Sequence, residues 1–293
     1  MKKFKRFAYI FIFIIILALS FIVYKSLAKD STTDIRDKTL SEIKYFESKI
    51  IYMCNALNSI EFENYKIYSE DITASNTSKP ENESSSKENS ESSSESQSTS
   101  EETKKYTLNS KGVLSSKEQI NWDYIKKEAE TLQNSISTMT LDLYEISLNN
   151  SDILNFNKEY DNFLIQIKKE DKEATLKELA VLYSYIPRFI KNCNKDEKYE
   201  IIINTKENII NAYALLDTDD WTQITKYLQS ANDSYSKLLT DIRYKNKDQY
   251  TINKCYITLN NLQNCTEKKD KEIFLIKYRN LLEDFNNLWY NII

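Results

Sequence analysis

Residues 217–242 read DTDDWTQITKYLQSANDSYSKLLTDI, and this stretch carries the pattern that decides the fold. Its apolar residues are spaced alternately three and four apart, at Trp221, Ile224, Leu228, Ala231, Tyr235, Leu238 and Ile242. This spacing draws one apolar stripe along one face of an α-helix. Asp217-Thr218-Asp219, just before it, is typical of residues that cap the start of a helix. The stretch therefore predicts an amphipathic helix that packs against other helices.

The same alternation recurs on both sides of this stretch. It predicts helices over residues 122–146, 153–167, 172–193, 196–216, 252–262 and 274–292. The chain contains one Gly, Gly112, and two Pro, and so few turn residues argue against an all-β fold. We therefore expect an all-α body, either an antiparallel helical bundle or an array of αα-hairpins. A single continuous coiled coil is not expected, because the stripes change phase at each break.

Helix starts recur at a regular interval. Those at Trp122, Lys172, Trp221 and Lys271 are separated by 50, 49 and 50 residues, and Asp often precedes them. Regular spacing is typical of hairpin arrays, but helices of similar length in a bundle also produce it. Because Gly is scarce, we expect Asn to occupy the left-handed positions where helices stop. The candidates are Asn149, Asn150, Asn192, Asn194, Asn246 and Asn264.

Residues 30–70 carry a further stripe, at Ile43, Phe46, Ile50, Met53, Leu57 and Ile60. This predicts a membrane-proximal helix that continues to about Tyr68. Residues 71–117 are rich in Ser, Glu, Asn and Thr, and we expect a disordered linker there. Residues 118–293 then form the helical-bundle domain. The linker is either a long loop within one bundle or a tether for a separate body. We favour the loop, because the 30–70 stripe needs a partner.

Residues 1–29 predict a cytoplasmic basic tip and a transmembrane anchor. Phe7–Tyr24 is an apolar run of 18 residues, and as a helix it would span about 27 Å, close to the thickness of a bilayer core. Lysines and an arginine precede it, which predicts a cytoplasmic N-terminus and a body outside the cytoplasm. The alternative is cleavage near Ala28, which would release a secreted protein.

The residue inventory excludes several kinds of site. The chain has no His, which removes Ser-His-Asp and Cys-His catalysis and His-bearing zinc sites. P-loops and dinucleotide-binding fingerprints need several glycines, and the chain has only one. The net charge of −4, with both signs interspersed, argues against binding of nucleic acid. The sequence therefore nominates no catalytic, cofactor-binding or metal-binding residue, and no cofactor.

A few residues remain as weaker candidates. Outside the cytoplasm, Cys54, Cys193, Cys255 and Cys265 could form disulfides, but buried free thiols are the expectation. Pro187 predicts a kink or hinge, a simple bend, or a break into two shorter helices. Some tyrosines lie off the stripe of the 30–70 helix and suggest a second contact surface, facing another subunit or lipid headgroups. They are Tyr45, Tyr52, Tyr65 and Tyr68. The carboxylates of Asp123, Asp219 and Asp220 are explained better as helix caps than as a glycosidase pair.

Residues 171–187, DKEATLKELAVLYSYIP, together with Asp219-Asp220-Trp221, resemble a pattern in membrane-anchored all-helical proteins of low-GC Gram-positive bacteria. The resemblance covers about a third of the chain. It implies a location and a fold class but no mechanism, since such proteins have no assigned activity. We expect a non-enzymatic protein that acts through a protein partner or self-association at the cell envelope. The alternative is a binding protein that holds a lipid, peptide or cell-wall glycan between its helices, near Pro187.

Overall fold

The computed structural model describes residues 35–58, 60, 114, 119–146, 148–240 and 248–292. Phe7–Tyr24, Tyr65, Tyr68 and all of 71–117 except Leu114 lie outside this part. The described part is built from helices, so the all-α prediction is confirmed. None of these helices is both long enough and apolar enough to cross a bilayer.

The first described helix spans residues 35–56. The helices that follow are α2 (Trp122–Glu145), α3 (Asn150–Lys169), α4 (Lys172–Tyr183), α5 (Ile186–Cys193), α6 (Glu197–Ala214), α7 (Trp221–Leu239), α8 (Gln249–Cys265) and α9 (Lys271–Ile292). Short 3-10 turns, Leu216–Thr218 and Thr266–Lys268, precede α7 and α9.

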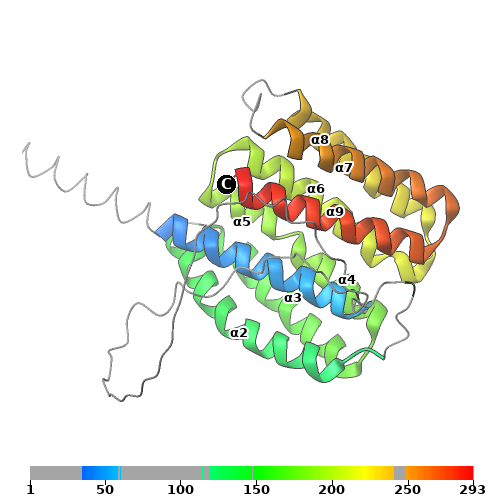
Figure 1. The fold of residues 1–293 in the computed structure, drawn as a ribbon. Coiled ribbons are helices and arrows are strands. Elements are labelled where there is room, and N and C mark those ends of the chain that lie inside the picture. The colour runs from blue at the N-terminus through cyan, green and yellow to red at the C-terminus, as the bar shows by residue number, and fades with distance from the viewer. Residues whose placement is uncertain are drawn as a thin grey trace, which may run out of the picture.

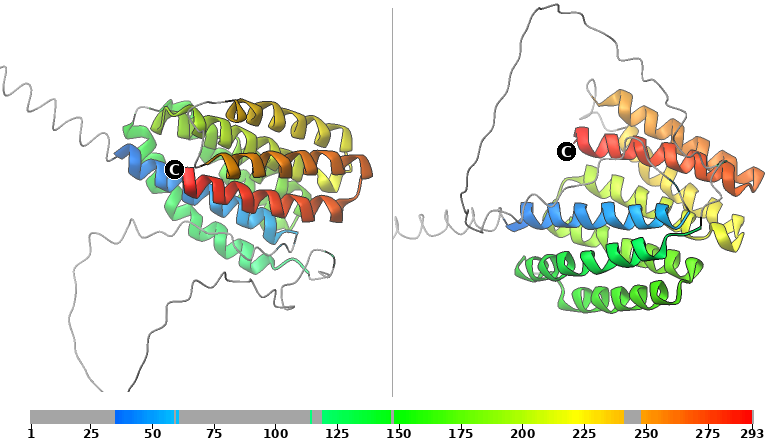
Figure 2. Two further views of the ribbon diagram at one scale, coloured as in Figure 1. Left: turned by 45° about the horizontal axis from the view of Figure 1, so that its top comes forward. Right: turned by 60° about the horizontal axis from the view of Figure 1, so that its bottom comes forward.

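Three helices that are distant in sequence form the centre of the bundle: 35–56, α6 and α9 (Figure 1). The ring of Tyr213 on α6 stacks on that of Tyr278 on α9, with centroids 4.2 Å apart. The ammonium of Lys44, on the 35–56 helix, lies 5.3 Å from the ring centroid of Trp289 on α9. Helices α2 to α5 cover one side of this centre, and α7 and α8 cover the other (Figure 2).

The 35–56 helix contacts other helices on several of its sides. Phe46 meets Phe156 of α3 edge-on, with ring centroids 5.2 Å apart. On other sides, Lys49 pairs with Glu128 of α2 at 2.7 Å, and Cys54 accepts a hydrogen bond from the hydroxyl of Tyr213 at 2.9 Å through its backbone oxygen. The buried apolar residues of this helix and those of 125–289 belong to one cluster. Among the described residues, the 35–56 helix therefore shares one core with the helices that follow residue 118.

This central position corrects two expectations for the segment. Tyr45, expected on an outer contact surface, is only 9% exposed, and Tyr52 packs edge-on against Tyr124 of α2. The physical reason is that the helix packs against α2, α3 and α6 at once, which leaves little of this side open. The helix was also expected to continue to about Tyr68, but it ends at residue 56, where the N–H groups of Asn58 and Ile60 both donate to the Asn55 carbonyl.

One joint recurs at the ends of three helix pairs. A residue in the left-handed region stops the preceding segment, and an Asp caps the next helix: Glu170-Asp171, Asp219-Asp220 and Lys269-Asp270. Each Asp accepts a hydrogen bond of 3.0 Å from the backbone N–H three residues on. The joints are about 50 residues apart, which is the interval seen in the sequence. The units nevertheless form a bundle, because α9 packs on α6 from an earlier unit.

Asn246 lies outside the described residues. The other expected Asn stops are wrong, since the described non-glycine residues with positive φ are Glu170, Asp219 and Lys269. Asn instead caps helix starts. The side chains of Asn121 and Asn149 accept hydrogen bonds from the first-turn N–H groups of α2 and α3. At the start of α3, the side-chain oxygen of Asn149 accepts this hydrogen bond from the N–H of Ser151 at 3.0 Å. Asn149 therefore begins a helix instead of ending one.

Pro187 does not kink a continuous helix. α4 ends at Tyr183 and α5 begins at Ile186, so Pro187 lies in the first turn of α5. A first-turn residue has no partner for its N–H within the helix, and proline is tolerated there. Of the three alternatives that the sequence left open at Pro187, the structure therefore shows the break into two shorter helices.

Candidate functional site

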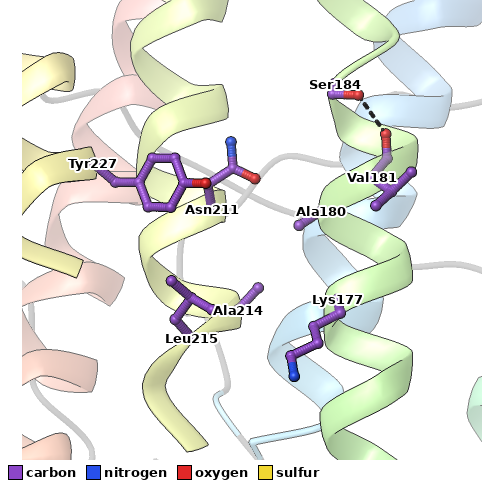
Figure 3. Close-up of a pocket in the computed structure, with 8 residues that line it drawn as sticks. All are labelled: Lys177, Ala180, Val181, Ser184, Asn211, Ala214, Leu215 and Tyr227. Carbon is purple, nitrogen blue, oxygen red and sulfur yellow. Dashed lines mark hydrogen bonds between the residues drawn. The ribbon is translucent and has the colours of Figure 1, made fainter. Parts of the chain in front are cut away.

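A shallow groove of about 290 Å³ lies beside the break between α4 and α5. Ala180 and Val181 of α4, with Ser184 just after it, line one side, and α6 with Tyr227 of α7 lines the other (Figure 3). Val181 is 41% exposed, so the groove presents an apolar side chain to solvent. Pro187, in the first turn of α5, follows this break directly in sequence.

The size and polarity of the groove limit what it could hold. Two of its polar groups already have partners. The hydroxyl of Ser184 donates to the Val181 carbonyl at 2.7 Å, and the ammonium of Lys177 pairs with Glu173 at 2.6 Å. Small-molecule sites usually measure about 300–1,000 Å³ and enclose most of the ligand. The groove is therefore better suited to one or two apolar side chains of a partner than to a whole lipid.

A buried ionic cluster lies where the 35–56 helix meets α4 and α6. The carboxylate of Glu47 pairs with the ammonium of Lys206, and the hydroxyl of Tyr183 donates to the same carboxylate oxygen at 2.6 Å. Both charged side chains are only 4% exposed. Charges removed from water in this way are tolerated only when they are paired and hydrogen-bonded. The cluster therefore requires all three helices to be in place.

Lys44 adds a second buried cation to this region. Its ammonium lies over the rings of Tyr199 and Trp289, 5.4 and 5.3 Å from their centroids. Burial lowers the pKa of Lys44 to about 8. A lysine with a lowered pKa can act as a nucleophile. Lys44 is only 6% exposed, however, so a substrate has no access to it.

A second charged group lies at the end where the 35–56 helix begins. Lys38 pairs with Asp142 of α2 at 2.7 Å and with Glu42 at 3.6 Å. Burial, followed by repulsion from Asp142, raises the pKa of Glu42 to about 7. This group fixes the C-terminal end of α2 beside the start of the 35–56 helix.

The four cysteines are free. Cys54, Cys255 and Cys265 are buried, and Cys193 is partly buried. Burial raises the pKa of Cys193 and of Cys255 to about 12 and that of Cys265 to about 11. Thiols with such pKa values are weak nucleophiles at neutral pH. The cysteines therefore act as small apolar side chains of the core.

The three carboxylates that were weighed as a glycosidase pair each have a structural role. Asp220 caps α7, and Asp219 pairs with Lys271 at 3.2 Å. Asp123 lies in the first turn of α2, where a negative charge is favourable. In the parts of the chain that are described, no three potential metal ligands gather into a group.

The sequence did not single out Lys44, Glu47 or Lys206. A signal for the first two does exist in the 35–56 helix. Leu40, Lys44, Glu47, Ile51 and Cys54 follow a spacing of four and three beside the main stripe. Two charged residues within a second stripe of this kind indicate buried charges on a helix that is covered on both faces.

Comparison of the chain with protein-family models, with curated proteins and with solved structures found no match.

Proposed function

We propose that the chain is a non-enzymatic, single-pass membrane protein. Its helical body stands outside the cytoplasm and acts through protein–protein contacts at the cell envelope. The observation that carries the proposal is the central position of the 35–56 helix, which follows the apolar run Phe7–Tyr24 closely in sequence. An anchor joined to the central helix would hold the whole body at the membrane. The protein would then present its outer helices to a partner.

Two further features favour contact over catalysis. The chain has no His, and Lys44 and three of the four cysteines are buried. The groove between α4, α6 and α7 is shallow and mostly apolar, as a docking site for side chains of a partner would be. We propose this groove as the contact site.

The test is cross-linking of the tagged, full-length protein in its own membranes, followed by mass spectrometry. Val181→Glu places a charge in the groove, while Ile257→Glu places one on an exposed position of α8. We expect the wild type and Ile257→Glu to capture the same protein and Val181→Glu to lose it. Equal capture by both variants would remove the groove from the proposal. A hydrolase or transferase activity that is lost on changing one carboxylate would overturn the non-enzymatic assignment.

A second candidate function is binding of a short peptide or glycan fragment in the same groove, close to Pro187. The Asn211 and Tyr227 side chains in its wall favour this alternative, since both carry hydrogen-bonding groups. Thermal unfolding of the full chain in detergent, with and without muropeptides, tests it. A rise in Tm that Val181→Trp abolishes by filling the groove would support binding, and an unchanged Tm would contradict it.

A further inference from the structure

Three exposed apolar side chains lie near the turn between α2 and α3. Leu141 and Tyr144, near the end of α2, are 58% and 59% exposed, and Leu154, near the start of α3, is 69% exposed. The two helices pack against each other as a hairpin, so all three residues lie within about two turns of one connection. We call these three residues the α2–α3 patch. Exposed apolar residues that occur singly are normal, but a cluster indicates a contact.

The patch lies toward the end of the bundle at which the 35–56 helix begins. Lys38, in the first turn of that helix, pairs with Asp142 at 2.7 Å, and Asp142 stands between Leu141 and Tyr144 in sequence. Figure 2 shows the start of the 35–56 helix and the neighbouring end of α2 on the same side of the molecule.

The length of chain before residue 35 limits how far this end can be from the apolar run. The residues between Tyr24 and Ile35 can span at most about 40 Å, even when fully extended. If Phe7–Tyr24 spans a bilayer, the chain that leaves the lipid enters the body at the end that carries the patch.

We infer that the α2–α3 patch rests on the lipid surface, with Leu141 and Leu154 among the upper acyl chains and Tyr144 at headgroup level. The inference depends on the proposed membrane anchor. Tyrosine is enriched at this depth because its ring is apolar and its hydroxyl is polar. The contact is apolar rather than electrostatic, since Glu145, the next residue after Tyr144, is also exposed. High salt should therefore leave it intact, because salt screens only charge interactions.

The chain offers a matched pair of positions for the test. Leu154 and Ile165 are both exposed apolar residues of α3, 69% and 48% exposed. They are about three turns apart, so they lie on the same face of one helix, separated along it by about 16 Å. A tryptophan at either position senses the same face, close to the patch or far from it.

The full-length protein is reconstituted into phosphatidylglycerol and phosphatidylcholine vesicles, with and without dibrominated phosphatidylcholine as a contact quencher. The emission of the wild type, which has three Trp, is subtracted from that of Leu154→Trp and Ile165→Trp. We expect brominated lipid to reduce the added emission of Leu154→Trp and to leave that of Ile165→Trp unchanged, at low salt and at high salt alike.

The outcomes separate this inference from the anchor. A chain that does not float with the vesicles after alkaline extraction would overturn both. A chain that floats but shows no quenching of Leu154→Trp would overturn the patch contact alone. Emission that is blue-shifted yet unquenched would place the patch against another protein, and equal quenching at both positions would place the body flat on the membrane. Either result would contradict the inference.

Discussion

At the scale of single residues, the buried pair of Glu47 and Lys206 is the most sensitive feature of the core. Breaking a buried ion pair from one side leaves an uncompensated charge, which costs about 3–5 kcal/mol. We expect Glu47→Gln to lower the free energy of unfolding by about 3 kcal/mol, because Lys206 would lose its partner and Tyr183 a charged acceptor. Urea unfolding of the detergent-solubilised chain, followed by circular dichroism, measures the change.

Two comparisons make this prediction specific. The pair of Lys177 and Glu173 is exposed on α4, so Glu173→Gln should change the stability by no more than about 0.5 kcal/mol. Replacing both buried partners, as Glu47→Leu with Lys206→Met, should recover much of the loss, since apolar pairs of similar volume often substitute for buried ion pairs. A Glu47→Gln variant as stable as the wild type would show that the pair is not buried as described.

Glu42 predicts a pH dependence. Its pKa is raised to about 7 in the folded state, from an ordinary value near 4.5. The folded state therefore holds the proton more tightly, and the stabilising contribution is complete below pH 4.5 and is lost as the pH rises through 7. We expect the wild type to lose about 1–2 kcal/mol over this window relative to Glu42→Gln. Parallel stability curves for the two proteins between pH 4.5 and 7.5 would contradict the assignment.

At the scale of helices, the repeated joint accounts for the regular interval in the sequence. A left-handed residue directly before a capping Asp reverses the chain within two residues. Left-handed backbone costs a non-glycine residue roughly 1 kcal/mol. Lys269→Gly should therefore raise the stability by about 0.5–1 kcal/mol. Lys268→Gly, in the 3-10 turn one residue earlier, should lower it, and thermal unfolding of the two variants distinguishes them.

The sequence was informative about helices because each stripe is a local property. The stripe from Trp221 to Leu238 was sufficient to predict α7, although its cap is Asp220 rather than a residue of Asp217-Thr218-Asp219. The left-handed stops at Glu170 and Lys269 were not predictable in the same way, because Glu and Lys are not favoured there and only the local chain reversal requires them. The sequence also could not decide the local structure at Pro187, since a proline fits a kink, a bend or the first turn of a new helix.

At the scale of the whole molecule, the apolar stripes could not predict how the helices are arranged. A stripe indicates that a helix has a buried face, but not which helix covers it. Tyr45 was expected to be exposed because only one stripe of its helix was considered, whereas the second stripe, with Lys44 and Glu47, is also buried. The groove beside α4 likewise depends on which helices become neighbours, so it has no signature in the sequence.

The central claim is that the 35–56 helix is an integral part of the core and joins the body to the preceding apolar run. Residues 1–70 and 118–293, expressed together as two separate chains, test this most directly through membrane fractionation. We predict that 118–293 is recovered in the membrane fraction with 1–70, and that Glu47→Arg in the shorter chain releases it, because Arg would face Lys206. Recovery of folded 118–293 in the soluble fraction, with 1–70 alone in the membrane, would contradict the claim.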